Sequence, residues 1–257
     1  MRSRSSEPLA VSSINAISLN LTHKNPVLNK VFNDKQFRVA LSYAINRQEI
    51  IDTVYLGQGE AAQVAPLAGT EFYDEEMTKQ YTEYDPEKAK QILKQAGYTN
   101  VSIDFVLMKD FYPKQLEITQ AVAAMLGEVG IKVNIKNLEI ATAREQRSAG
   151  TYDMFYSGWA HMPHDPDWYF GQWFTKAGSE KLTRYNNPRV EQLIAEGRVP
   201  DPKVRQAKYE ELERILWDEE PEIWLCYTVA IYGVSDRLRN FEARRDYYVL
   251  LGDVSIA

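Results

Sequence analysis

Two periods of hydrophobic and polar positions run along the chain and separate predicted strands from predicted helices. Residues 14–22 read INAISLNLT, in which apolar and polar positions alternate, as is typical of a half-buried strand. The same period of two predicts strands over residues 101–107, 131–137 and 152–159. A longer apolar run over residues 222–234 indicates a further strand or a pair of strands.

A period near 3.6 residues predicts helices between these strands, and capping residues mark their ends. Residues 34–57 are expected to form one helix, with Asp34 as its N-cap and Gly57 as its stop. Arg38 and Arg47 fall on the polar side of this helix, where we expect them to pair with local acids and to contribute little stability. The apolar stripe of the helix comprises Phe37, Leu41, Ala44 and Ile45.

The same signals predict further helices. One begins at Asp85 and ends at Gly97, which suits a C-terminal cap. Another is expected over residues 114–128, and Asn-Pro and Asp-Pro pairs at 187–188 and 201–202 introduce two more. The apolar face expected for the 114–128 helix comprises Ile118, Val122, Met125 and Val129. Strands separated by helices of this length predict an α/β fold, with a mixed sheet flanked by helices.

Composition and charge narrow the class of protein. Hydrophobic residues make up 44% of the 257 residues and charged residues 26%, which is ordinary for a globular protein. The net charge of −6 and the scattered Lys and Arg residues predict no nucleic-acid partner and no polybasic membrane anchor. Residues 1–13 lack the apolar core of a signal peptide, so we expect a linker or a cloning remnant there. The single cysteine, Cys226, is expected to be a small buried hydrophobe.

Residues 156–174, YSGWAHMPHDPDWYFGQWF, concentrate seven aromatic side chains around two histidines, two aspartates and two prolines. Tyr156 and Trp159 are predicted to line a ligand pocket, because large rigid rings provide much contact area at little entropic cost. For the following aromatics we favour the apolar face of a short helix capped by Asp165, with Trp168 kept as a pocket candidate. That group comprises Trp168, Phe170, Trp173 and Phe174.

The same stretch allows two chemical alternatives. His161 and His164 beside Asp165 are weak candidates for zinc or nickel ligands, because an HxxH spacing in a loop is a poor signal. Asp153, Asp165 and Asp167 could supply an acid pair for glycoside hydrolysis, but two of them are neighbours in a proline-bounded turn where capping is the ordinary role. No nucleophile elbow, phosphate loop or zinc-protease motif occurs in the sequence. We therefore predict no metal, no cofactor and no enzyme activity.

Several stretches, in this order, resemble the extracytoplasmic solute-binding proteins of peptide-type ABC importers, bacterial family 5. They are FNDKQFRVALSYAINRQEII, YDPEKAKQILKQAGY, EVGIKV, YDMFYSGW followed by DPD, and a last helix ending in a proline before an apolar strand. The family includes oligopeptide-, dipeptide- and nickel-binding proteins, and the resemblance covers residues 14–241. It implies a two-lobed fold of the type II periplasmic-binding kind, in which the lobes enclose a ligand for delivery to a membrane permease. It also implies an extracytoplasmic protein, free or held by a lipid anchor.

The resemblance also implies a division of the chain. Residues 14–234 correspond to the C-terminal ligand-binding lobe, with strand crossings to the other lobe near residues 13–21 and 224–234. The tail, residues 235–257, would pack on an N-terminal lobe that this sequence lacks, so we expect the chain to be a fragment.

The ligand expected from the resemblance is a small peptide or an oligosaccharide. In peptide-binding members an aspartate after the Gly-Trp pair holds the ligand's amino group, and Met162 stands at that position here. Either Asp165 substitutes, or the ligand is not a free peptide. The predicted ligand-binding residues are Tyr156, Trp159, His161, Met162, Asp165, Trp168 and Tyr227. A ligand-sensing module of a transcription regulator and a nickel-binding member remain as alternatives.

Overall fold

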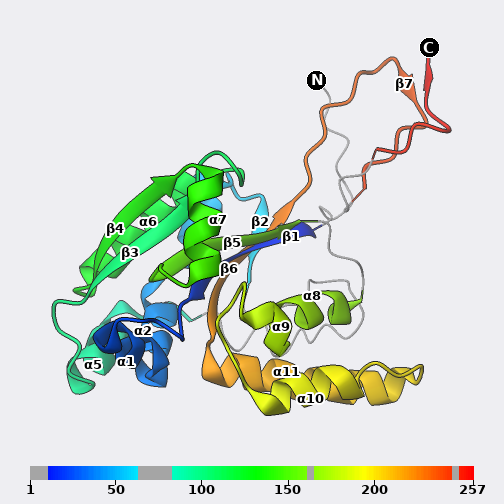
Figure 1. Ribbon diagram of the computed structural model, residues 1–257. Coiled ribbons are helices and arrows are strands. Elements are labelled where there is room, and N and C mark those ends of the chain that lie inside the picture. The colour runs from blue at the N-terminus through cyan, green and yellow to red at the C-terminus, as the bar shows by residue number, and fades with distance from the viewer. Residues whose placement is uncertain (1–10, 63–82, 161–164, 245–248) are drawn as a thin grey trace.

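A six-stranded mixed sheet forms the centre of the computed structural model, which describes residues 11–62, 83–160, 165–244 and 249–257 (Figure 1). The strand order is β2-β6-β1-β5-β3-β4. The strands are β1 (Val11–Leu19), β2 (Gly59–Ala61), β3 (Ser102–Met108), β4 (Lys132–Leu138), β5 (Met154–Ala160) and β6 (Glu222–Val229). This confirms the predicted α/β class with a mixed sheet.

The strand directions define one functional edge of this sheet. β3 is parallel to both β4 and β5, whereas β1 is antiparallel to β5 and β6. β3, β4, β5 and β6 therefore run the same way and end at one edge, where β1 begins. In open α/β sheets such a carboxyl edge is the usual place for a ligand.

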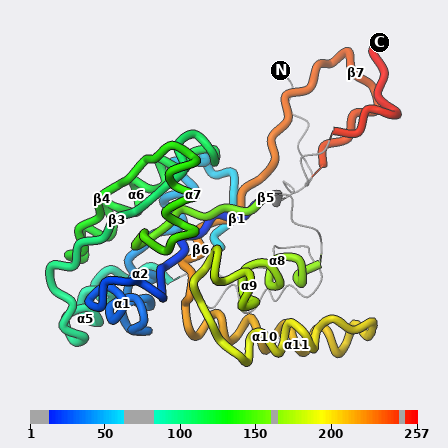
Figure 2. Tube along the Cα trace, in the orientation of Figure 1, coloured from blue at the N-terminus to red at the C-terminus, as the bar shows by residue number. Residues whose placement is uncertain are grey.

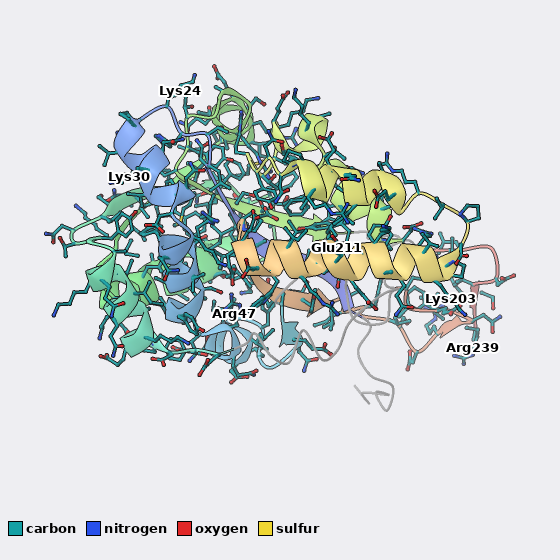
Figure 3. The ribbon with its side chains drawn as sticks, turned by 90° about the horizontal axis from the view of Figure 1, so that it is seen from below. Lys24, Lys30, Arg47, Lys203, Glu211 and Arg239 are labelled. Carbon is teal, nitrogen blue, oxygen red and sulfur yellow. The ribbon has the colours of Figure 1, made fainter. Side chains whose placement is uncertain are left out.

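Helices cover both faces of the sheet (Figures 1 and 2). On one side lie α1 (Pro26–Asn33), α2 (Lys35–Ala44), α3 (Arg47–Val54), α5 (Pro86–Gln95) and α6 (Gln115–Glu128). On the other side lie α7 (Ile140–Ala149), α8 (Pro166–Trp173), α9 (Lys176–Ser179), α10 (Pro188–Glu196) and α11 (Pro202–Glu219). Seen from below, α11 runs beside α10, with Lys203 near its start and Glu211 near its middle (Figure 3). Arg189 of α10 joins the two helices through an ion pair of 2.6 Å to Glu211.

Most predicted helix ends are confirmed, because local side chains make them. Asp34 accepts a hydrogen bond from the backbone N–H of Gln36, and Asp85 accepts one from Lys88. Gly57 and Gly97 both adopt the left-handed conformation, with φ of 78°. The apolar faces predicted for the 34–57 and 114–128 segments are buried.

The prediction of one helix over residues 34–57 is wrong. The segment forms α2 and α3, with an extended Ile45 between them. The side chain of Asn46 accepts a hydrogen bond from the backbone N–H of Glu49 and so caps a new helix. Among the described residues, helices α1, α7 and α9 were not predicted.

The expected surface role of Arg38 and Arg47 is also wrong, because these side chains are only 6% and 4% exposed. Arg38 donates to the backbone oxygens of Phe32 and Glu219, at 2.9 and 2.8 Å, near the C-terminal ends of α1 and α11. Arg47 donates to the oxygen of Trp224 at 2.7 Å. Each guanidinium therefore satisfies carbonyl groups that would otherwise be buried without a donor.

β1 is buried on both faces, so the prediction of a half-buried strand is wrong as well. Its polar side chains point at partners inside the molecule. Asn15 accepts a hydrogen bond from the Tyr156 hydroxyl at 2.9 Å, and the Ser18 hydroxyl donates to Glu222 at 2.6 Å. Apolar and polar residues do alternate along β1, but helices cover both faces of the sheet at this strand.

After β6 the chain leaves the sheet as an arm that extends away from the body (Figure 2). A short hairpin of β7 (Leu238–Arg239) and β8 (Ser255–Ile256) closes this arm. The arm carries exposed apolar side chains, among them Ile231, Leu250 and Leu251.

Candidate functional site

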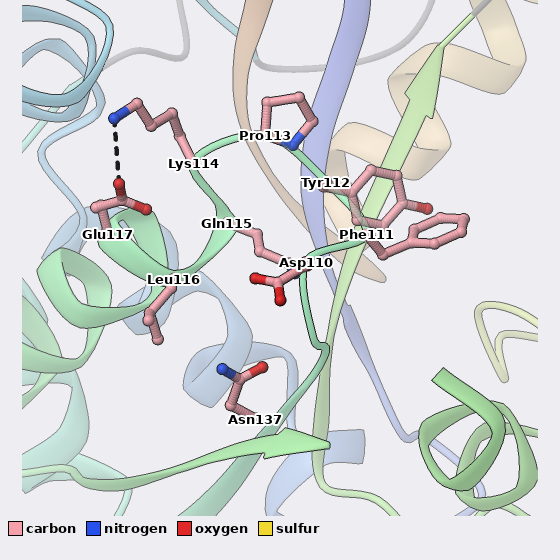
Figure 4. Close-up of a pocket in the computed structure, with 9 residues that line it drawn as sticks. All are labelled: Asp110, Phe111, Tyr112, Pro113, Lys114, Gln115, Leu116, Glu117 and Asn137. Atoms are coloured by element: carbon pink, nitrogen blue, oxygen red, sulfur yellow. Dashed lines mark hydrogen bonds and ion pairs between the residues drawn. The ribbon is translucent and has the colours of Figure 1, made fainter. Parts of the chain in front are cut away.

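The carboxyl edge of the sheet gathers the loop of residues 109–114 after β3, the end of β5 and the start of α8. A pocket of about 390 Å³ opens at the loop (Figure 4). Its lining comes from the loop, the first turn of α6 and the end of β4. The lining residues are Asp110, Phe111, Tyr112, Pro113, Lys114, Gln115, Leu116, Glu117 and Asn137.

The backbone of this loop is strained at two positions. Asp110 and Lys114 have φ of 55° and 62°, in the left-handed region that non-glycine residues adopt at a cost. Lys114 occupies the N-cap position of α6 and provides no side-chain cap. Its ammonium group instead pairs with Glu117 at 3.2 Å, an exposed ion pair at the rim of the pocket.

Hydrogen bonds anchor the loop and the first residue of α6 to the sheet. The backbone N–H of Lys109 donates to the oxygen of Leu138 at 2.8 Å. The amide of Gln115, only 3% exposed, donates to the oxygen of Met108. The hydroxyl of Tyr112 donates to the oxygen of Gly158 at 2.9 Å, which ties the loop to β5.

Two tryptophans form an aromatic wall beside the end of β5. The half-buried ring of Trp159 meets Trp168 edge to face, with 4.6 Å between ring centroids. Trp173 lies behind them, 5.5 Å from Trp159. Within the described part of the chain, the buried indole N–H of Trp159 has no hydrogen-bond partner. The wall thus provides a ring surface, with the indole N–H of Trp159 buried behind it.

Asp165 fixes the start of the helix that carries Trp168. Its side chain accepts a hydrogen bond from the backbone N–H of Asp167 at 2.9 Å, which confirms the predicted cap. The same carboxylate pairs with Arg205 of α11 at 2.6 Å. Two partners therefore already occupy Asp165 in this structure.

The other predicted site residues are distributed differently. Tyr156 and Tyr227 are fully buried, so they lie beneath the edge and not on an open surface. Burial raises the pKa of Tyr156 well above its ordinary value, which keeps its hydroxyl a neutral donor to Asn15. Phe170, Trp173 and Phe174 lie in the core, which confirms the helical-face interpretation for them. The predictions for His161, Met162 and His164 fall outside the described residues.

No cluster of three or more metal-ligating side chains is present among the residues that the structure describes. Over the same ranges, no helix is both long and apolar enough to cross a bilayer. Two buried carboxyl groups, Glu220 and Glu222, have their pKa values raised to about 7 by burial. They lie at the opposite end of β6 from the pocket and so take no part in the site.

Tyr112, Lys114 and Gln115 were not predicted to belong to the site. The segment KDFYPKQ between a predicted strand and a predicted helix was a signal for a site, because loops at strand ends commonly carry binding residues. The hydrogen bond from Tyr112 to Gly158 joins positions 46 residues apart, so no local sequence pattern could predict it.

Residues 7–181 match the family model described as bacterial extracellular solute-binding proteins, family 5, middle region. The chain is 29% identical over 217 residues to heme-binding protein A of Haemophilus influenzae, a match that covers 82% of this chain and 39% of that protein. It is 28% identical over 224 residues to the dipeptide-binding protein of Escherichia coli, covering 84% and 41%. The chain thus spans about 40% of the length of these curated relatives.

Solved structures show the same fold. The periplasmic binding protein DppA from Helicobacter pylori, in complex with the peptide STSA, matches with a TM-score of 0.75 and 27% identity, over 86% of this chain and 43% of that one. A dipeptide-binding protein from Pseudoalteromonas, in complex with Met-Leu, matches with a TM-score of 0.82 and 20% identity, over 98% and 50%. These likenesses confirm the predicted type II periplasmic-binding fold.

Proposed function

The chain belongs to family 5 of the bacterial extracellular solute-binding proteins, and on that premise we propose that it forms the ligand-binding C-terminal lobe of an ABC importer's substrate-binding component. In this proposal residues 14–234 are the lobe, and β1 and β6 are its two crossings to an N-terminal lobe. Residues 1–13 act as a linker, and residues 235–257 pack on the other lobe. The comparisons do not favour the module of a transcription regulator.

One observation supports this function above the others. The pocket at residues 110–117 and the wall of Trp159 and Trp168 lie at the edge where β1 begins and β6 ends. A second lobe joined through those two strands would face both features. Hinge closure would then bury a ligand between the lobes and present the closed form to a permease.

The proposed ligand is a small peptide, because the curated relatives of this chain include a dipeptide-binding protein and a glutathione-binding protein. The chemistry of the edge suits a zwitterion with an apolar side chain. Lys114 offers an ammonium group at the pocket rim, and Trp159 and Trp168 offer a ring surface. We propose that Trp159, Trp168 and Asp165, with His161 and Met162, face the ligand, while Tyr156 and Tyr227 support this layer from below. An oligosaccharide stacked on the same rings is the second candidate.

The proposed mechanism is capture without chemical change, with no cofactor. Bound ligand should therefore be recovered intact by mass spectrometry after denaturation of the complex. The proposed place of action is outside the cytoplasmic membrane, either free or held by a lipid anchor, with the permease as partner.

Isothermal titration of the full-length protein with short peptides and short oligosaccharides tests the function. We expect micromolar or tighter binding of a peptide, weakened at least about tenfold by Trp159→Ala, because buried aromatic anchors dominate such interfaces. Trp217→Ala is the matched control, since Trp217 lies half-buried on α11, beside a different pocket. Sugar binding that depends on Trp159 would support the second candidate. Absence of any binding across the panel would refute the proposal.

A further inference from the structure

The ring of Tyr112 lies directly on the backbone of Gly158. A Cβ atom added at position 158 would stand 2.9 Å from Cε1 and 3.0 Å from Cδ1 of Tyr112. It would also stand 3.3 Å from the Oδ1 atom of Asn15. Glycine is therefore required here by the close approach of a ring and not by its own backbone conformation.

Other contacts hold the same ring from several sides. The Tyr112 hydroxyl donates to the oxygen of Gly158 at 2.9 Å, and its ring lies 5.7 Å from that of Tyr156. Phe111 packs edge to face on Tyr112 at 4.7 Å, and the guanidinium of Arg144 lies over Phe111 at 5.5 Å. The half-buried Tyr112 ring thus has one well-defined seat.

A hydrogen-bonded layer forms the floor of this seat. Asn15 of β1 accepts from the Tyr156 hydroxyl and donates to the Tyr55 hydroxyl at 3.3 Å. Its amide also contacts the Cys226 sulfur of β6 at 3.8 Å. The seat of Tyr112 is therefore built on the two strands proposed as lobe crossings.

We propose that the contact between Tyr112 and Gly158, here called the clamp, positions the 109–114 loop and thereby determines ligand selectivity. Tyr112 is a positioning residue in this proposal, which rests on the proposed ligand-binding function. It lines the pocket and also touches β5 one residue before Trp159. The clamp consequently sets the separation between the pocket and the tryptophan wall, and so the length of ligand that can reach both.

The strained backbone of the loop explains why the loop needs the clamp to hold its conformation. Asp110 and Lys114 both hold left-handed conformations, which persist only when surrounding contacts impose them. Displacing Tyr112 removes the contact between the loop and β5, so the two residues are free to relax. The rim ammonium group of Lys114 would then move relative to Trp159.

Gly158→Ala in the full-length protein tests the clamp, with Gly127→Ala as the matched control. Gly127 lies in α6, and a Cβ atom there meets nothing within 4 Å. The readout is the ratio of dissociation constants for a dipeptide and its tripeptide extension. We expect Gly158→Ala to change this ratio at least about fivefold and Gly127→Ala to leave it unchanged, since a purely structural defect scales both constants equally.

A double-mutant cycle with Tyr112→Ala establishes that the ring transmits the effect. Without the ring the added methyl loses its two closest contacts and keeps only the Asn15 Oδ1 atom at 3.3 Å, so Gly158→Ala should change the ratio much less in the Tyr112→Ala background. Independent, additive effects would overturn the proposal, as would an unchanged ratio in Gly158→Ala.

Hydrogen exchange on the 257-residue chain separates this proposal from the proposed function. We expect Gly158→Ala, but not Gly127→Ala, to accelerate exchange at the amides of residues 109–115, whether or not any ligand binds. Unchanged exchange would overturn the clamp. A wild-type protein that binds no peptide, yet shows the accelerated exchange, would overturn the function and the selectivity role while leaving the clamp in place.

Discussion

Glu222 is a fully buried carboxyl group in the middle of the molecule, bonded to side chains from two other elements. It accepts from Ser18 of β1 at 2.6 Å and from Tyr169 of α8 at 3.1 Å. Burial raises its pKa to about 7, although Ser18, the nearby Arg147 and Tyr169 favour the charged form. In the folded state this carboxyl group therefore stays mostly protonated up to about pH 7. A glutamate in the unfolded chain already ionises at its ordinary, lower pKa.

This preference predicts a pH dependence of stability at the residue scale. Because the folded pKa is raised, the contribution of Glu222 is fully present below the unfolded pKa and is lost as the pH rises through about 7. Glu222→Gln keeps the shape of the side chain and one acceptor oxygen but cannot ionise, and its amide nitrogen donates, so one of the two partner hydroxyls must turn to accept. Between about pH 5 and pH 8 the free energy of unfolding of the wild type should fall, relative to this variant, by on the order of 3 kcal/mol.

Urea unfolding at a series of pH values measures this difference. Glu128→Gln, at an exposed glutamate of α6, is the control and should track the wild type. A wild type and Glu222→Gln with parallel pH profiles would show that the buried carboxyl group has no raised pKa.

At the scale of the element, the junction of α2 and α3 depends on Asn46. The side chain of Asn46 accepts from the N–H of Glu49 at 3.1 Å, and the next residue, Arg47, places its guanidinium on the Trp224 oxygen. The cap thus directs a helix whose first residue supports β6. Asn46→Ala should reduce the free energy of unfolding by about 1 kcal/mol, as is usual for a lost N-cap.

Thermal or urea unfolding of Asn46→Ala measures that cost, with Asn186→Ala as the control at an exposed asparagine outside a helix. A loss well above the size of a cap would indicate that Arg47 also leaves the Trp224 oxygen. Equal stability of the two variants would contradict the assigned cap.

The distance along the chain between interacting residues explains which elements the sequence could predict. Strands, caps at Asp34 and Asp85 and the apolar faces depend on neighbours within a few residues, so the local pattern was sufficient. The partners of Arg47 and Ser18 lie 177 and 204 residues away, so neither burial was visible in the sequence. For the site, helical spacing indicated the burial of Phe170, Trp173 and Phe174, whereas the burial of Tyr156 could be recognised only in three dimensions.

At the scale of the whole molecule, the arm after β6 has the features of a segment that packs elsewhere. Figure 1 shows it extending away from the body, and Leu250, Leu251 and Ile256 are exposed on it. Exposed apolar side chains of this kind mark surfaces that are covered in a larger assembly. In the proposed two-lobed protein, the N-terminal lobe covers them.

Limited trypsin digestion tests this arrangement, because Arg237 and Arg239 lie in the arm and Lys203 and Arg189 lie in the α10–α11 pair. In the 257-residue chain we expect cleavage in the arm first, since exposed segments outside the core open at little cost. In the full-length protein the arm sites should be cut at least about tenfold more slowly, whereas the rates at Lys203 and Arg189 should remain unchanged. Equal cleavage of the arm in both proteins would mean that the N-terminal lobe does not cover it. The proposed role of residues 235–257 would then fail, whereas the proposals for the pocket and the clamp would not be affected.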